Sequence, residues 1–230
     1  MRRKEHEQLN ENDENPFASS SGDLMAGLMF IFVLLLSAMM LQVQKRADKD
    51  EEITKEYKRI KTQLYIDLEE EFKDDLKVWN AVIDSTKLSI RFQEPSTLFD
   101  FSESKLKVEF KDILDDFFPR YLALLSSDKY KDNIEEIRIE GHTDSHGSYE
   151  SNMKLSQDRT RAVLNYCLSM VKEDDLKEWT TYRITANGLS YSRLIFDEDG
   201  NENPDLSRRV EFRIRTNAEQ QLEKIAKERM

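Results

Sequence analysis

Residues 141–159, with the sequence GHTDSHGSYESNMKLSQDR, decide the fold because they carry the chain from a strand through a polar turn into a helix. Before them, Ile137 and Ile139 alternate with charged residues, which is typical of a half-buried strand. Gly147 suits the turn because glycine adopts backbone conformations that other residues resist. After the turn, apolar residues recur at helical intervals, which predicts a helix over 151–171.

The segments on either side of this unit continue the alternation of strands and helices. Three of them alternate apolar with polar residues and are predicted as strands: 88–92, 182–186 and 210–214. Ser102 is expected to cap a helix whose apolar face reaches Tyr121, and Pro119 to kink or end that helix. The segment 191–206 contains Gly and Pro and is predicted as a loop. The class is therefore α+β, with residues 85–216 forming a small α/β sandwich around one mixed sheet.

The turn and the helix after it bring together residues that could bind a ligand. Asp144 stands in the turn, and the spacing of Asn152, Leu155 and Arg159 puts these three on one helical face. An acid and a base therefore converge near backbone N–H groups that suit an anion. Such a site fits a zwitterion, whose ammonium group would bind Asp144 and whose carboxylate would bind Arg159. The alternative is that Asp144 caps the helix while Arg159 forms a surface salt bridge.

Several other classes of function are not supported. His142 and His146 lack further ligands at metal spacing, so no metal site is expected. No set of nucleophile, base and orienting residue is visible, so we do not expect an enzyme. The formal net charge of -11 argues against a nucleic-acid-binding protein, which would carry a basic patch. The single cysteine, Cys167, excludes an intramolecular disulfide.

An uncharged apolar run over 24–43 is long enough to cross a bilayer core of roughly 30 Å as a helix. A signal peptide would have a shorter apolar region and a small-residue cleavage site, and 41–46 offers no such site. We therefore predict a transmembrane helix over 23–44 after a polar tail over 1–22. Basic residues flank both ends of the run, so the distribution of charge does not decide its orientation.

A charged segment over 45–84 follows and is predicted as a helical linker. Its apolar residues recur at intervals of three and four: Ile53, Tyr57, Ile60, Leu64, Leu68 and Phe72. Such a stripe fits a helix packed on its own domain as well as a helix paired with a second copy. The linker could equally act as a spacer or as a plug. Residues 217–230 form a polar C-terminal tail.

The turn and helix residues resemble the signature of the OmpA-like peptidoglycan-binding domain. The shared residues are Thr143, Asp144, Gly147, Asn152, Leu155, Ser156 and Arg159, followed by the late run Arg208-Arg209-Val210-Glu211. The resemblance implies that Asp144 and Arg159 bind the diaminopimelate of peptidoglycan, with Asn152 and Leu155 lining the site. It also places the domain in the periplasm of a bacterial inner-membrane protein, with the N-terminus in the cytoplasm. Thr160 and Ser207 depart from the family pattern.

Asp23 opens the apolar run and has two interpretations. It can cap the helix, or it can carry protons, because an ionisable residue at membrane depth usually has a functional partner. An Asp at the start of a lone membrane helix, followed by a spacer and an OmpA-like domain, resembles the MotB subunit of flagellar stators. The run Asn15-Pro16-Phe17 and the residues from Asp23 to Met29 resemble more closely the B subunit of the Zorya anti-phage defence system.

These resemblances imply a dimeric subunit of a motor complex, in which five MotA-like multi-spanning partners surround two copies of the single-pass subunit. The coupling ion is expected to be the proton, relayed by Asp23, and no other cofactor is expected. The leading hypothesis is a peptidoglycan-anchored subunit of such a motor that acts in phage defence. The alternatives are a flagellar stator B subunit and a passive anchor between the inner membrane and the cell wall.

Overall fold

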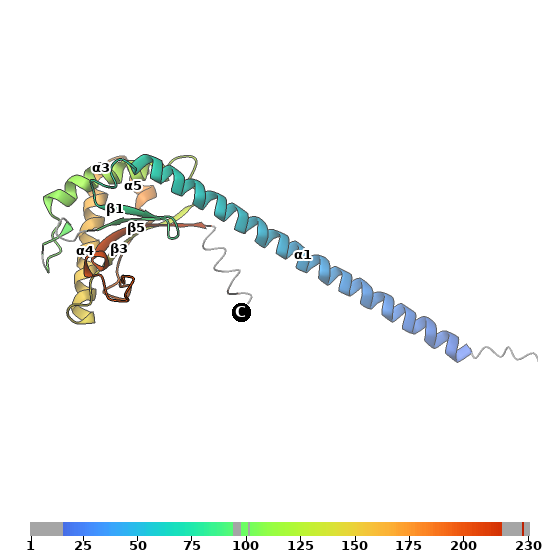
Figure 1. Cartoon of the computed structure of the whole chain (residues 1–230). Coiled ribbons are helices and arrows are strands. Elements are labelled where there is room, and N and C mark those ends of the chain that lie inside the picture. The colour runs from blue at the N-terminus through green and yellow to red at the C-terminus, as the bar shows by residue number, and fades with distance from the viewer. Residues whose placement is uncertain (1–15, 94–97, 101, 218–226, 228–230) are drawn as a thin grey trace, which may run out of the picture. The chain divides into compact units, whose positions relative to one another are not determined.

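The computed structural model describes residues 16–93, 98–100, 102–217 and 227 (Figure 1). The chain divides into two compact units, Met1–Glu51 and Glu52–Met230. Helix α1, Pro16–Phe72, begins in the first unit and ends in the second.

The second unit contains one sheet of five strands in the order β1-β2-β5-β3-β4. The strands are β1 Ala81–Asp84, β2 Ser89–Phe92, β3 Ile134–His142, β4 Ile184–Gly188 and β5 Arg209–Thr216. Strand β3 pairs in parallel with β4, and the other neighbours are antiparallel. The prediction of one mixed sheet is therefore confirmed.

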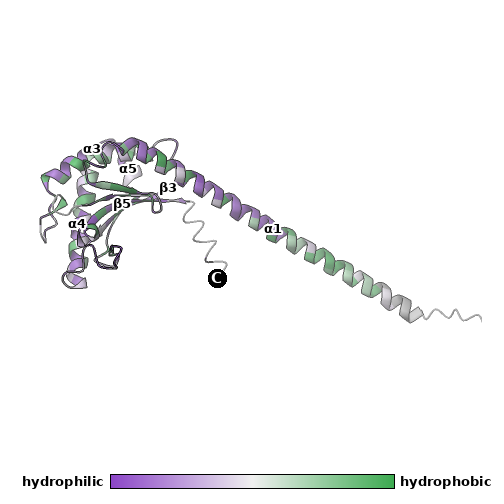
Figure 2. Ribbon diagram, viewed as in Figure 1, coloured by the Kyte–Doolittle hydropathy of each residue, from purple (hydrophilic) through white to green (hydrophobic). Residues whose placement is uncertain are grey.

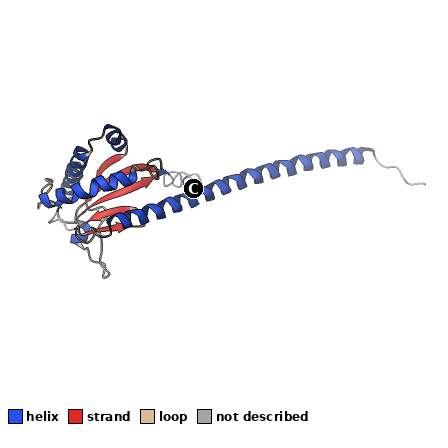
Figure 3. Cartoon of the chain, turned by 90° about the horizontal axis from the view of Figure 1, so that it is seen from above, coloured by secondary structure: helices blue, strands red, loops and turns tan. Residues whose placement is uncertain are grey.

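Helices cover one face of this sheet, as the blue helices and red strands of Figure 3 show. They are α3 Val108–Leu125, α4 Tyr149–Met170 and α5 Asp174–Thr181, together with the end of α1. The short helix α6, Pro204–Ser207, lies in the segment before β5. Alternate residues of each strand point toward the helices that cover the sheet. Phe212 of β5, for example, lies 5.1 Å from Phe117 and 6.0 Å from Tyr121 between ring centroids, and all three side chains are fully buried. Aromatic contacts of this kind fill the centre of the core.

The end of α1 belongs to this core. Leu64, Leu68 and Phe72 have no exposed surface, and Phe72 lies 5.3 Å from the Phe117 ring. Arg120 of α3 stacks on Phe72 and donates to the Glu71 carboxylate at 2.8 Å. Of the two arrangements that the apolar stripe allowed, the structure shows packing on the chain's own domain over 60–72.

The compact unit that contains the sheet extends beyond the predicted boundary of the domain at residue 85. The compact unit begins at Glu52, and β1, which lies before residue 85, forms an edge of the sheet. The spacing of the apolar stripe on α1 does not assign it to the domain, because the stripe fits a second copy of the helix as well as the chain's own domain. Strand β1 was not predicted because Ala81, Val82 and Ile83 are apolar in succession and show no alternation with polar residues.

The predicted start of α3 is wrong. The helix begins at Val108 with Lys107 as its N-cap residue, and Ser102 lies outside it with a positive φ of 59°. Pro119 sits inside the helix and does not end it. Phe117 and Phe118 before the proline, and Tyr121 after it, are all fully buried. Their packing outweighs the loss of one backbone hydrogen bond, which costs ~3 kcal/mol in an isolated helix.

In the first unit, α1 exposes its apolar run. Large apolar side chains between Leu24 and Val43 are exposed, and Figure 2 shows this part of α1 in green. Within the described ranges, α1 is the one helix long and apolar enough to cross a membrane, and its apolar window is entirely unburied. An apolar surface of this extent is stable in a bilayer rather than in water.

We predict that Leu68→Ala destabilises the fragment 52–230 by about 2–5 kcal/mol, because it opens a cavity at a fully buried position. Urea unfolding measures the difference. Glu70→Ala, at an exposed position of the same helix, is the matched control and should change stability by less than about 0.5 kcal/mol. Equal effects of the two variants would show that the end of α1 is not part of the folded domain.

Candidate functional site

Asp144 lies in the loop that leaves β3 and is nearly buried, with 9% of its surface exposed. Its Oδ1 atom accepts a hydrogen bond from the backbone N–H of His146 at 3.1 Å. Its Oδ2 atom accepts one from Nη1 of Arg208, which stands just before β5. Asp144 does not cap α4, because Ser148 does so by accepting from the N–H of Ser151 at 3.2 Å. The carboxylate is therefore held toward the interior of the site.

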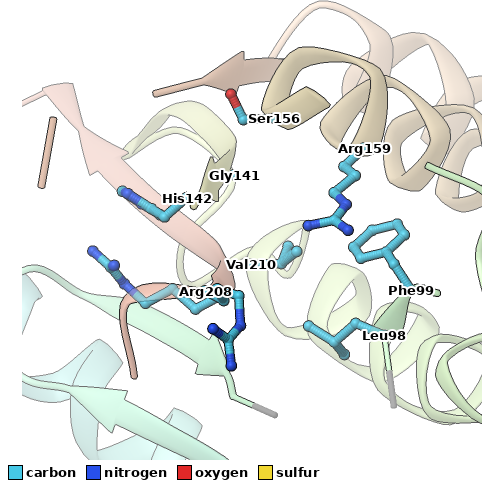
Figure 4. A pocket seen from close by; sticks show the side chains of 9 residues that line it. Leu98, Phe99, Gly141, His142, Ser156, Arg159, Arg208 and Val210 are labelled. Carbon is cyan, nitrogen blue, oxygen red and sulfur yellow. The ribbon is translucent and has the colours of Figure 1, made fainter. Parts of the chain in front are cut away.

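Arg159 of α4 is equally buried, at 9% exposed. Its Nε donates to the carbonyl of Glu103 at 2.8 Å, and Nη2 donates to that of Asp100 at 3.3 Å. The guanidinium stacks on Phe99, 4.7 Å from the ring centroid, as Figure 4 shows. Burial and, to a smaller extent, the positive charge of Arg208 lower the pKa of Arg159 to about 10, against the opposing effect of the Asp144 charge. Arg159 remains protonated at neutral pH, and no described carboxylate lies within ion-pair distance of it.

Asn152 and Leu155 have different positions on α4. Asn152 is buried and donates from Nδ2 to the carbonyl of His146 at 2.7 Å, so it holds the loop that carries Asp144. Leu155 is half-buried and lines an open trough on the flank of the helix. The structure thus brings Asp144, Asn152 and Arg159 together, with Leu155 at the border of the group.

Two glycines let α4 approach the sheet closely enough to build this site. A Cβ atom on Gly141 of β3 would lie 2.6 Å from Cγ2 of Thr160, and one on Gly188 of β4 would lie 2.3 Å from the backbone N of Gln157. Both distances are far below van der Waals contact. Ser156, between these contacts, accepts from the N–H of Ser190 at 3.0 Å and ties the helix to the loop after β4.

Arg208 is a site residue to which sequence reasoning gave no role. It pairs with Asp144 and also with Asp205. Arg208, Arg159, Phe99 and His142 are among the residues around a cavity of about 10 Å³, room for roughly one water molecule. The adjacent arginines Arg208 and Arg209 could have indicated a basic residue in the site, but no local spacing shows which of the two faces Asp144. The site therefore holds one carboxylate and two guanidinium groups.

The other face of the sheet carries a buried ionic network. Glu211 of β5, with 1% of its surface exposed, accepts from Nε of Arg209 at 2.6 Å and from Nε of Arg91 at 3.1 Å. The hydrogen bond and charge of Arg209 lower the pKa of Glu211 to about 2 against the opposing effect of burial. His142 lies 3.7 Å from Glu140, and burial lowers its pKa, so it is neutral at pH 7.

This network contains the one described group of side chains with metal-ligand spacing. Ligand atoms of Glu140, His142 and Glu211 lie within 4.8 Å of one another. However, Arg209 and Arg91 already neutralise Glu211, and Arg138 lies 3.6 Å from Glu140. A cation placed here would have to displace these guanidiniums, so the residues fit an ion-pair network better than a metal site.

Asp23 lies within α1, near the start of the apolar run. Its side chain falls outside what the structure describes, so its proposed part in proton relay stays a prediction.

Comparison with known proteins decides the family. The model of the OmpA family matches residues 98–208, which include all of the site loop and α4. The Zorya protein ZorB of Escherichia coli strain Crooks is 42% identical over 225 residues, which cover 94% of this chain and 95% of that protein. The chain belongs to the ZorB family. A ZorB from a second Escherichia coli strain is 30% identical over 207 residues, covering 87% of this chain and 80% of that one.

Solved structures similar to this ZorB-family chain include a MotB-like protein from Desulfovibrio vulgaris. It is 21% identical with a TM-score of 0.48, and the match covers 68% of this chain and 94% of that one.

We predict that Glu211 contributes stability that is lost in acid. Because its pKa is lower in the folded than in the unfolded chain, the contribution is complete above the unfolded value of 4.5 and falls as the pH drops toward 2. Glu211→Gln should lower the free energy of unfolding at pH 7 and reduce its slope between pH 5 and 3. Urea unfolding of the fragment 52–230 at several pH values measures this. Glu150→Gln, at an exposed position of α4, is the control, and an identical slope in both variants would contradict the assignment.

Proposed function

We propose that the chain is the peptidoglycan-anchored subunit of a proton-driven inner-membrane motor complex that acts in anti-phage defence. The observation that carries the proposal is the 42% identity to a Zorya protein ZorB over 94% of the chain. The likeness therefore extends well beyond the OmpA match at 98–208 and takes in most of the remaining chain. A membrane-spanning helix and a wall-binding domain in one chain are the two parts that such a subunit requires.

The geometry of the site supports anchoring to peptidoglycan. The side chain of diaminopimelate ends in an ammonium and a carboxylate group, which are the charges that Asp144 and Arg159 complement. The Arg159 guanidinium is desolvated and lacks a carboxylate among its described contacts, so an incoming carboxylate gains a strong charge-assisted bond. The ligand's ammonium group would replace Arg208 on Asp144. Wall binding would place the C-terminal unit in the periplasm and the N-terminal tail in the cytoplasm.

The motor role rests on Asp23 and on the family. Asp23 would relay protons between the membrane helix and a MotA-like multi-spanning partner, with two copies of this chain inside a ring of five partners. In this proposal the chain has no catalytic site and needs no cofactor besides the coupling protons.

We predict that the double variant Asp144→Ala/Arg159→Ala loses binding to isolated sacculi by at least about tenfold, because both charges that bind the zwitterion are removed. A pull-down with purified sacculi measures the bound fraction. Arg161→Ala is the matched control, because Arg161 lies on the same helix with its side chain 71% exposed. Undiminished binding by the double variant would refute the assignment of the site.

We also predict that Asp23→Asn abolishes protection against phage while the complex still assembles, because an amide keeps the size of the side chain but cannot release a proton. Plaque counts measure protection, and co-purification measures assembly. Asp48→Asn, in the charged part of the same helix, is the control and should protect normally. Normal protection by Asp23→Asn would favour a passive anchor, in which Asp23 only caps the helix.

A further inference from the structure

An open trough of about 450 Å³ lies on the flank of α4, next to the site of Asp144 and Arg159. The loop 102–105 forms one wall and the N-terminal half of α4 forms the other. Its lining consists mainly of polar residues: Ser102, Glu103, Ser104, Lys105, Ser151, Lys154, Leu155 and Asp158. A volume of this size falls within the range of ligand pockets, roughly 300–1,000 Å³.

The trough is joined to the site by the site's own arginine. Arg159 donates to the carbonyl of Glu103, which is part of the trough's wall, and to that of Asp100 just before it. Leu155, one helical turn before Arg159, lies in the other wall. A ligand whose carboxylate binds Arg159 therefore starts next to the trough.

The trough offers a ligand charges of both signs and hydrogen-bonding groups. Lys154 is paired with Asp158 at 2.9 Å, which leaves one lining cation, Lys105, and one lining carboxylate, Glu103, without an ion-pair partner among the described residues. Ser102, Ser104 and Ser151 offer hydroxyl groups along the walls. Peptides carry amide groups for such hydroxyls, and their free carboxylates suit an exposed ammonium group.

The cavity beside Arg159 is too small to hold a whole peptidoglycan fragment. The cavity between Arg159 and Arg208 measures about 10 Å³, which is room for roughly one water molecule. The rest of a stem peptide must lie outside it, and Leu155 is the point at which the site meets the trough.

We propose that the trough is an extension subsite that takes the peptide arm of a peptidoglycan fragment beyond its diaminopimelate residue, with Lys105 binding a carboxylate of that arm. This inference rests on the proposed binding of diaminopimelate at Asp144 and Arg159. It adds a second determinant of affinity, one that free diaminopimelate cannot reach.

Calorimetric titration of the full chain in detergent tests the proposal with three ligands: free meso-diaminopimelate, a soluble stem tetrapeptide that contains it, and the same peptide with the carboxylates outside diaminopimelate amidated. The wild type should bind the tetrapeptide more tightly than either other ligand. Lys105→Glu should weaken the affinity for the tetrapeptide by roughly five- to tenfold and leave the affinity for free diaminopimelate unchanged. Lys172→Glu, exposed and outside the trough, is the charge-matched control. Ser104→Trp, which fills the trough, should repeat the selective loss.

Two results would overturn the inference, and they differ from each other. In the first, the wild type binds diaminopimelate, but Lys105→Glu and Lys172→Glu change the affinity for the tetrapeptide equally. The trough is then not a subsite, while the proposed binding of diaminopimelate at Asp144 and Arg159 stands. If the wild type binds none of the three ligands, diaminopimelate recognition fails, and the extension subsite fails with it.

Discussion

The close contact between α4 and the sheet is the constraint on which the rest of the site depends. Gly141 and Gly188 lack the Cβ atoms that would meet Thr160 and the backbone of Gln157. Because the helix can come this near, Asn152 reaches the loop after β3, and Arg159 lies buried beside the Asp144 carboxylate. A helix held even one side-chain radius farther out would separate Arg159 from Asp144, and the arrangement proposed to bind a zwitterion would be lost.

Burying the charged groups of the site has an energetic cost that the fold offsets. Arg159 is desolvated, but two backbone carbonyls and the Phe99 ring hold its guanidinium in place. Asp144 is satisfied by Arg208, which also pairs with the exposed Asp205 and can therefore move away without losing every partner. Arg209, the residue after Arg208, is held in place by its hydrogen bond to Glu211 in the buried network. This bond fixes the start of β5 next to Arg208.

The sequence predicted the parts of the site that depend on local spacing. Asp144, Asn152 and Arg159 converge because a turn and the helix that follows it set their positions within a few residues. Arg208 could not be placed in this way. It meets Asp144 only because β5 pairs with β3, with Arg209 opposite His142, across 64 residues of chain. The same limit applies to the end of α1, whose apolar stripe fits two partners, and to Pro119, where buried neighbours override a local rule.

The proposed function requires this chain to work as part of a motor with a multi-spanning partner. The most direct measurement is to purify the chain from its native operon in mild detergent and to quantify the proteins that accompany it. Our account predicts a MotA-like multi-spanning protein in excess over this chain. Recovery of the chain alone, from preparations in which known membrane complexes survive, would contradict the account and leave a passive tether between the membrane and the wall.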